Sequence, residues 1–394
     1  MKNDINGDAL LDRVNQIAPI IREHAAEAEQ QRQLSRPVVD AMLEAGLYKM
    51  ARPKAYGGLE MDPVSIFRVV EAIARLDAAA AWNLQISVGA HLILAWLPDD
   101  GAAEILDTHP STIIAGSFTP GRYANAVDGG YRLTGQWPFV SGGHHCHWLV
   151  FIPQIKDGDT PRTSDEGAPV QRYVWLPADK AKVLDTWHTL GMRGTGSHDV
   201  VVEGVFIPER CTALLAPLER PGKAFQGPLY RLTVWAPIAM LAVPALGVAR
   251  AAVDALVELA RVKTPSYIAS SLARRQVTQR QVAQAQATLQ AGRAYLYETF
   301  RENWEAVLRG EPIDQARKID MQLAATHAAV CAAEAVDLVH AAAGASAIRN
   351  EYKFQQWFRD VHTMTQHAFN GASRYESAGA LMLGAESDWG FFAF

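Results

Sequence analysis

Gly135-Gln136-Trp137-Pro138-Phe139-Val140-Ser141-Gly142 is the part of the chain with the most chemical information. Its two aromatic residues can form a wall for a planar ligand, its serine supplies a small hydroxyl group, and glycine lets the backbone approach a ligand closely. The stretch therefore suits the edge of a planar cofactor. It also stands inside a β-rich region, and the sequence on both sides of that region is helical.

The residues that follow, Gly143-His144-His145-Cys146-His147-Trp148, place histidine and cysteine close together, and both are transition-metal ligands. We expect a strand here, on which alternate side chains point to opposite faces, so that the histidines do not all converge. No Cys-x-x-Cys or His-Glu-x-x-His lies elsewhere in the chain. We therefore interpret the run as a strand with polar edge residues and predict no metal site.

Short segments rich in β-branched and aromatic residues predict the strands of this region. Asp128-Gly129-Gly130 is a good hairpin turn between two of them. The polar run from Lys156 to Pro169 predicts a mobile loop. The predicted strands cover residues 111–117, 131–134, 148–152, 173–176 and 200–202, the last continuing through 206–207.

Both flanks are predicted to be helical, because their apolar residues recur every three or four positions. Ser35-Arg36-Pro37 is a helix-start signal in the N-terminal flank. Further helices are predicted at 63–76 and 79–96, and long Ala-rich ones at 236–262, 272–308 and 316–343. The expected fold class is mostly α with a central β domain. Its domains are an N-terminal helical domain (1–111), a central β domain (112–222) and a C-terminal helical bundle (223–394).

The composition is that of an ordinary globular protein, since 49% of the 394 residues are hydrophobic and 20% are charged. The 37 basic and 42 acidic residues leave a net charge of −5 without a long Lys/Arg run, which argues against nucleic-acid or anionic-membrane partners. The three cysteines are widely separated, the start Met1-Lys2-Asn3-Asp4-Ile5 leads into no apolar signal sequence, and no run approaches about 18 uninterrupted apolar residues. We expect a cytoplasmic protein with no membrane partner.

The common motifs of tight nucleotide binding are missing from the chain. Gly191-Met192-Arg193-Gly194-Thr195-Gly196 is the nearest string to G-x-G-x-x-G. It lacks the last glycine of the motif, lies between predicted strands and opens no helix. There is also no Walker A loop and no G-x-S-x-G elbow. Nicotinamide or nucleoside-triphosphate binding of the usual kinds therefore has no support.

Several short motifs, taken together, resemble the acyl-CoA dehydrogenase fold and, within it, the two-component flavin-dependent aromatic monooxygenases. That group includes the 4-hydroxyphenylacetate, steroid-phenol and indole-acetate hydroxylases. The resemblance covers nearly all of the chain, and its order and spacing make it specific. It is carried by Ala80-Ala81-Trp82-Asn83 with His91, by Gly116-Ser117, by residues 135–142, 190–197 and 205–209, and by Arg359-Asp360 before Gln366-His367.

The resemblance implies a β-barrel-like middle domain and a C-terminal four-helix bundle that assembles into a homotetramer. Reduced flavin (FADH2 or FMNH2) would lie between the β domain and the bundle, and its reaction with O2 would give a C4a-hydroperoxide that hydroxylates an aromatic small molecule, phenolic or indolic. A separate NAD(P)H-dependent flavin reductase would supply the flavin. The missing nicotinamide motif agrees with this division of labour.

The resemblance also implies roles for single residues. Ser141, with Gly142, is the position expected to hydrogen-bond near flavin N5, although a serine at a strand end also bonds its own backbone. Trp137 and Phe139 would face either the flavin or the core. His367 is the expected catalytic residue, which takes a proton from a phenol or indole nitrogen or steadies the hydroperoxide; the alternative is a buried histidine bonded to a helix carbonyl.

The remaining candidates each have a simpler alternative. His91, Ser117 and Trp82 match substrate-binding positions, and His91 is also a candidate catalytic residue, but a histidine on an apolar helix face is often a core residue. Arg231 lies near the flavin ring or on the surface. Thr195, Ser197 and Arg274, with Arg275 and Arg280, are candidates for the flavin phosphate, while charged runs on helices are often solvated faces.

One departure from the acyl-CoA dehydrogenases is informative. Many of them carry a catalytic carboxylate followed by glycine about nine residues after Arg-Asp, and residues 361–369 contain no Asp or Glu. Dehydrogenation is weakened by this departure but stays an alternative. An N- or S-oxygenase of the same fold and a non-catalytic flavin-fold protein are the other two.

Overall fold

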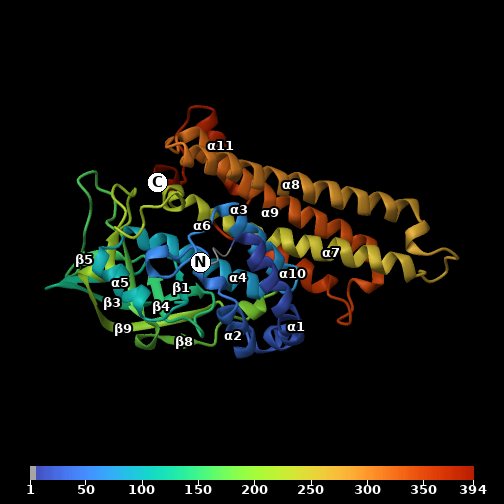
Figure 1. Cartoon of the computed structure of the whole chain (residues 1–394), viewed down its shortest axis with the longest axis horizontal. Helices are drawn as coiled ribbons and strands as arrows, with labels where there is room; N and C mark the ends of the chain where they lie inside the picture. The colour runs from blue at the N-terminus through green and yellow to red at the C-terminus, as the bar shows by residue number, and fades with distance from the viewer. Residues whose placement is uncertain (1–5) are drawn as a thin grey trace.

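The computed structural model describes residues 6–394 as helices, then strands, then helices, in the order that the sequence predicts (Figure 1). Met1–Ile5, for which we predict no signal sequence, lie outside the described residues. The predicted domain changes near 112 and 223 fall in the two connections between the helical and β-rich parts, after Asp107 and after Leu214. The N-terminal helices are α1 (Gly7–Gln31), α2 (Arg36–Glu44), α3 (Pro63–Ala74), α4 (Ala78–Ile93) and α5 (Asp99–Asp107).

Side-chain caps explain where three of these helices begin. Asn6, Asp62 and Asp77 each accept a hydrogen bond from a backbone N–H in the first turn, of α1, α3 and α4 respectively. The predicted start at Ser35 is confirmed by α2, which has a proline in its first turn, although the Ser35 side chain makes no capping bond.

The β-rich part consists of two sheets, with strand orders β1-β4-β7-β10 and β6-β5-β2-β3-β9-β8. The predicted hairpin is confirmed, because β2 pairs antiparallel with β3 and the turn closes at Val127 and Gly130. The polar run from Lys156 to Pro169 holds the end of β5 and the short strand β6 that pairs with it, so the run is not wholly a loop. The strands are β1 (Ile114–Ser117), β2 (Tyr123–Val127), β3 (Gly130–Val140), β4 (Trp148–Phe151), β5 (Gln154–Asp157), β6 (Thr160–Pro161), β7 (Arg172–Pro177), β8 (Lys182–Leu184), β9 (His198–Pro208) and β10 (Thr212–Leu214).

The C-terminal part is a bundle whose longest members, α8 and α9, run side by side (Figure 1). The predicted helix 236–262 is two helices, since the chain turns at Leu241-Ala242 and the next helix begins at Val243 with Pro244 in its first turn. The predicted helix at 272–308 begins at Gln276, after the short 3-10 turn Leu272–Arg274. The helices are α6 (Trp235–Met240), α7 (Val243–Val262), α8 (Gln276–Leu308), α9 (Gln315–Ala343), α10 (Phe354–Met364) and α11 (Ser373–Met382).

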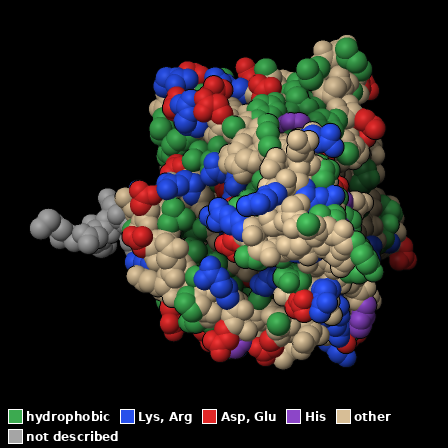
Figure 2. Space-filling model, turned by 90° about the vertical axis from the view of Figure 1, so that its right-hand side faces the viewer, with side chains coloured by type: hydrophobic (Ala, Val, Ile, Leu, Met, Phe, Trp, Pro, Cys, Tyr) green, Lys and Arg blue, Asp and Glu red, His purple; other side chains and the backbone are tan. Residues whose placement is uncertain are grey.

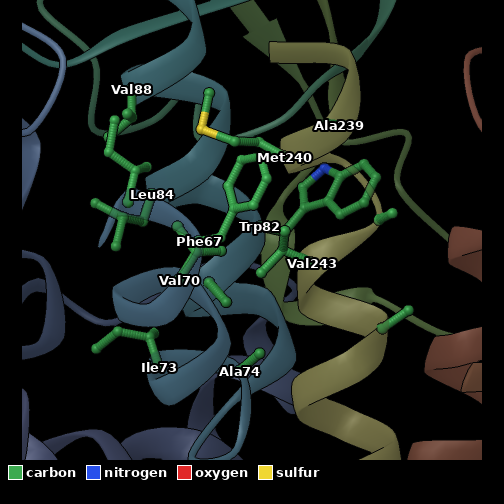
Figure 3. Packing of buried hydrophobic residues seen from close by; sticks show 14 of the residues in the cluster. Phe67, Val70, Ile73, Ala74, Trp82, Leu84, Val88, Ala239, Met240 and Val243 are labelled. Atoms are coloured by element: carbon green, nitrogen blue, oxygen red, sulfur yellow. The ribbon is translucent and has the colours of Figure 1, made fainter. Parts of the chain in front are cut away.

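A shared apolar core joins the N-terminal helices to the bundle. Figure 3 shows Phe67 of α3 and Trp82 of α4 packed towards Met240 and Val243. The helices approach closely where α3 crosses α7, because a Cβ on Gly247 would lie 2.5 Å from the Ala74 side chain. Burial of such large side chains stabilises the fold by roughly 1.5–3 kcal/mol each. The core therefore fixes α4, and with it the residues that α4 presents to the β domain.

Three helical segments are long and apolar enough to cross a membrane by length and composition: Ala78–Trp96, Trp235–Val262 and Gln315–Ser346. Their apolar windows are 94%, 83% and 56% buried inside the protein, in that order. Packing against the rest of the chain accounts for the apolar character of the first two. That the chain has no membrane partner stays a prediction.

Candidate active site

Ser141 lies where α4, the end of β3 and the 190–197 loop meet. It occupies a hydrogen-bonded turn directly after β3 and is almost fully buried. The indole N–H of Trp82, on α4, donates to Ser141 Oγ over 3.1 Å. The backbone N–H of Gly142, which has φ of +73°, donates to the carbonyl of Thr195 over 3.0 Å. The structure therefore brings together Trp82, a predicted substrate-binding residue, and Ser141 and Gly142, the predicted flavin-binding residues.

Thr195 and Ser197 extend this site as a chain of hydroxyl groups. Ser141 Oγ lies 2.7 Å from Ser197 Oγ, which lies 2.6 Å from Thr195 Oγ1. Thr195 Oγ1 donates to the carbonyl of Met192 over 2.8 Å. The sequence predicts both residues at the flavin phosphate. The structure places their hydroxyls in the interior, where Ser197 bonds the Ser141 side chain and Thr195 bonds Ser197.

Asn83 is the residue that sequence reasoning missed. Its side chain is only 6% exposed, and neither its amide nitrogen nor its amide oxygen has a partner within the described part of the chain. The amide lies against Gly142, where an added Cβ would be 3.4 Å from Asn83 Cγ. A buried amide without partners costs free energy unless a ligand pairs with it. The edge of a flavin ring carries both donors and acceptors, so this site fits that cofactor. Trp82-Asn83 within the family motif was the available signal.

His367 lies just beyond the C-terminus of α10. The centroids of its ring and the Trp82 ring are 5.6 Å apart, in an edge-to-face arrangement. Burial lowers the pKa of His367 to about 4, so the imidazole is neutral at neutral pH. The backbone N–H of Phe369 donates to Nδ1 over 3.3 Å, which places the proton of the neutral ring on Nε2. His367 is therefore next to Trp82 as a neutral hydrogen-bond donor.

His91 and Ser117 are both buried, but no hydrogen bond connects either to Ser141 in residues 6–394. His91 Nδ1 donates to the Ser87 carbonyl over 2.8 Å, and burial lowers its pKa to about 4. Its Nε2 has no partner among the described residues, so it is a free acceptor. The Ser117 hydroxyl pairs with Thr119 Oγ1 over 3.0 Å. The unpartnered nitrogen favours a ligand-facing role for His91 over a purely structural one.

Trp137 and Phe139 point in different directions. Trp137 is fully buried inside the β domain and stacks on Phe151 with ring centroids 4.4 Å apart. Trp137 therefore takes the core alternative and not the flavin-facing one. Residues two apart on a regular strand share a face, but the pairing of β3 with β9 shifts register between Trp137 and Val140, so Phe139 leaves the core face. Phe139 has φ of +63° and is 61% exposed. The centroid of its ring lies 6.1 Å from that of Trp187, in an edge-to-face arrangement.

Arg231 and Arg274 both lie away from Ser141 in the folded chain. The Arg231 guanidinium donates to the carbonyls of Val307 and Glu311, so it caps the C-terminus of α8. Arg274 is exposed in the segment between α7 and α8. Figure 1 shows that α7 and α8 are joined at the end of the bundle far from the β strands. Figure 2 looks at this end of the molecule and shows Lys and Arg side chains gathered across it. One chain does not bring Arg274 to its own Ser141.

The histidine run lies in a turn, so the prediction of a strand here is wrong. Residues 141–145 form consecutive turns, which Gly142 and Gly143 permit. His145 Nε2 bonds the Leu34 carbonyl at 2.8 Å, and His147 Nδ1 accepts from the Ile113 N–H at 2.9 Å. Within residues 6–394, no group of three or more His, Cys, Asp or Glu side chains is arranged to hold a metal ion.

Asp360, on α10, is hydrogen-bonded to the 190–197 loop. Its carboxylate accepts from the Met192 N–H over 2.6 Å, and burial raises its pKa to about 7. Arg359 forms an ion pair with Glu29 of α1 at 2.9 Å. At Gly191 the loop approaches α10 so closely that a Cβ would lie 2.2 Å from the Arg359 carbonyl. The Arg359-Asp360 motif thus fixes the loop that carries Thr195 and Ser197.

Two family models match the chain: the N-terminal domain of acyl-CoA dehydrogenase over residues 9–107 and the C-terminal domain over residues 239–371. Indole-3-acetate monooxygenase of Pseudomonas putida is 35% identical over 381 residues, with 96% of this chain and 93% of that protein covered. The flavin-dependent monooxygenase oxygenase subunit HsaA of Rhodococcus jostii is 28% identical, with 92% and 95% covered.

Solved structures show the same fold. XiaF from Streptomyces sp., in complex with FADH2 and glycerol, has a TM-score of 0.89 at 24% identity and covers 97% of each chain. The 3-HSA hydroxylase from Rhodococcus sp. RHA1 has a TM-score of 0.88 at 24% identity and covers 98% of each chain. These likenesses confirm the predicted fold class. The identity to the indole-3-acetate monooxygenase and the two family models show that the chain belongs to the flavin-dependent monooxygenases of the acyl-CoA dehydrogenase fold.

Proposed function

We propose that this chain is the oxygenase component of a two-component system that hydroxylates an aromatic small molecule, phenolic or indolic, with reduced flavin and O2. The observation that carries the proposal is the buried site of Trp82, Ser141 and the unpartnered Asn83 amide beside the neutral His367. The names of relatives support the substrate class, since they include an indole-3-acetate monooxygenase and an FADH2-dependent resorcinol hydroxylase.

The chain's own residues bind, orient and shield the cofactor. Reduced flavin, FADH2 or FMNH2, supplies the electrons that activate O2 for transfer of one oxygen atom. Ser141 Oγ and the Asn83 amide would hold the polar edge of the ring, with Gly142 allowing close approach of the backbone. Trp82, His367 and Phe369 form an aromatic cluster that excludes water from this region.

His367 acts in this proposal as a hydrogen-bond donor rather than as a base. Its Nε2 carries the proton, because Nδ1 already accepts the Phe369 N–H. A neutral donor can steady an oxygen atom that develops negative charge without itself giving up a full proton. His91 Nε2 is an acceptor, and with Ser117 it is assigned to the substrate's hydroxyl or ring N–H.

The partner assignments follow the same reasoning. A separate NAD(P)H-dependent reductase supplies the flavin, as the names of an oxygenase subunit and of an oxygenase component among the relatives support.

A homotetramer is supported by exposed alanines along one face of α8, which let a second helix approach closely: Ala283, Ala287, Ala291 and Ala294. The division at 112 and 223 is kept as the domain assignment. A cytoplasmic location is supported by the three unpaired cysteines.

The test is turnover with isotopically labelled oxygen. The purified chain receives chemically reduced FAD or FMN, then 18O2, with indole-3-acetate and a panel of simple phenols as substrates. We expect one 18O atom in a hydroxylated product, and its loss in Ser141→Ala. No labelled product from any aromatic, together with bleaching of bound oxidised FAD by an acyl-CoA, would overturn the proposal in favour of a dehydrogenase.

A further inference from the structure

We infer that the hydroxyl chain from Trp82 to Met192 makes Ser141 a hydrogen-bond acceptor, and that Thr195 thereby sets the preference of the site for reduced over oxidised flavin. The inference rests on the proposed function, because it takes flavin as the ligand at Ser141. It assigns to Thr195 and Ser197 a positioning role that acts through Ser141, in place of phosphate binding.

The two ends of the chain fix the direction of every bond in it. The indole N–H of Trp82 can only donate, and the Met192 carbonyl can only accept. Each of the three hydroxyls between them has one proton to give. The bonds therefore run in one direction: Trp82 to Ser141, Ser141 to Ser197, Ser197 to Thr195, and Thr195 to the Met192 carbonyl.

This direction leaves Ser141 with a lone pair and no free proton. Reduced flavin presents an N–H at N5, whereas oxidised flavin presents a lone pair there. Ser141 can accept from the reduced form with every bond of the chain intact. To donate to the oxidised form, Ser141 must release its proton from Ser197, and both other hydroxyls must reverse. The reversal breaks the bond from Thr195 Oγ1 to the Met192 carbonyl.

Burial of the three hydroxyls favours the direction of hydrogen bonding that runs from Trp82 to the Met192 carbonyl. Ser141, Thr195 and Ser197 are all buried, so water does not readily replace a lost bond. The Met192 carbonyl keeps the Trp187 indole N–H (3.0 Å) and the Thr195 backbone N–H (3.1 Å) when the chain reverses. The difference is thus one net hydrogen bond. We expect the ratio of the two flavin Kd values to reflect it by about fivefold, which is about 1 kcal/mol at 1.4 kcal/mol per tenfold.

Thr195→Val tests the inference, because valine keeps the volume of threonine and removes its hydroxyl. Ser197 then has no acceptor at position 195 and donates to Ser141, which frees the Ser141 proton for oxidised flavin. Kd is measured for oxidised flavin by fluorescence quenching and for reduced flavin by anaerobic titration. We expect Kd(oxidised)/Kd(reduced) to fall about fivefold in Thr195→Val, and the midpoint potential of the bound flavin to fall with it.

Two further variants distinguish the effect of losing a hydroxyl group from the effect of altered packing at Thr195. Thr195→Ser retains the hydroxyl and should keep the wild-type ratio, while Ser197→Ala should lower the ratio as Thr195→Val does. An unchanged ratio in both hydroxyl-free variants, or an equal fall in Thr195→Ser, would overturn the inference. If Thr195→Val does not fold, Ser197→Ala decides alone. Failure of the wild-type chain to bind either flavin would count against the proposed function instead.

Discussion

Asn83 and Gln322 are two buried amides with opposite hydrogen-bonding states. Gln322 uses both ends of its side chain, since Nε2 donates to the Phe369 carbonyl and Oε1 accepts from the Trp389 indole. Asn83 uses neither end among the described residues. A folded chain keeps such a cost, about 1–3 kcal/mol for an unpaired buried group, where a ligand relieves it. The hydrogen-bonding state of a buried amide therefore indicates a ligand contact, whereas its residue type alone does not.

Replacement of Asn83 by leucine should separate stability from binding. Leucine has a similar shape and removes the unpaired amide, so we expect the ligand-free protein to gain about 1 kcal/mol, which for a chain of 394 residues raises Tm by about 1 °C. Flavin affinity should fall at least tenfold, because the ring edge loses its partner. Gln322→Leu is the matched control and should lower Tm. A fall in Tm for Asn83→Leu would mean that the amide is paired in solution.

His367 gives a prediction about pH. Its folded pKa of about 4 lies below the ordinary value of 6.5, so between these values the unfolded chain binds a proton that the folded chain does not. The unfolding free energy is thus independent of this group above pH 6.5 and falls as the pH drops from 6.5 to 4. His367→Gln should weaken the loss of stability on acidification, measured by denaturant titration at pH 7.5 and 4.5. Equal losses in both proteins would contradict the low pKa.

The same protonation state bears on catalysis. Because the wild-type imidazole is neutral across pH 6–9, product per flavin oxidised should show no step near pH 6.5 from this residue. His367→Ala should lower that yield and release more H2O2, while His367→Gln keeps a donor and should recover part of it. The measurement is product and peroxide quantified in the same reaction. A yield in His367→Gln as low as that of His367→Ala would count against the donor role.

At the scale of elements, α10 determines the position of the 190–197 loop through Asp360. The carboxylate has a folded pKa of about 7, above its ordinary 3.8, so the folded chain retains a proton that the unfolded chain loses between about pH 4 and 7. Its contribution to stability therefore decreases as the pH rises through that window. Burial is the main cause, and the bond from the Met192 N–H opposes it.

Asp360→Asn should stabilise the protein at alkaline pH. The asparagine amide oxygen still accepts the Met192 N–H, but it is never charged. We expect the unfolding free energy to exceed that of the wild type by a few kcal/mol at pH 8, and the difference to shrink towards pH 4. Asp337→Asn, which alters an exposed carboxylate, is the control for general charge effects. Parallel stability curves for Asp360→Asn and the wild type would show that the carboxylate is not desolvated.

The elements also show what the sequence could and could not predict. The hairpin at Asp128-Gly129 and the helix start at Arg36 depend on neighbours in sequence, and both predictions are confirmed. The hydroxyl chain joins Ser141 to Ser197 across 56 positions, and His145 bonds Leu34 across 111. No local pattern encodes such contacts. The family motifs named most of the site residues, but only packing shows that Ser197 contacts Ser141 and that Thr195 contacts Ser197.

At the scale of the whole molecule, two predicted flavin contacts lie at opposite ends of one chain. Ser141 is at the junction of α4 and the β domain, and Arg274 is in the exposed turn at the tip of the bundle (Figure 1). Basic side chains are gathered at that end (Figure 2). Guanidinium groups suit phosphate binding, so both contacts serve flavin only if the tip of one subunit reaches the site of another. We therefore propose that the flavin site includes residues from two subunits of the homotetramer.

Mixed oligomers test this arrangement directly. The wild-type protein should have a native mass near four times the 43.1 kDa of the chain. Arg274→Glu and Ser141→Ala should each weaken flavin binding when present in every subunit. Co-expressed with separate affinity tags, the two variants should regain binding in part of the sites, because an intact Ser141 from one chain meets an intact Arg274 from the other. A wild-type monomer that binds flavin tightly, or mixed oligomers with no regained binding, would place Arg274 outside the flavin site.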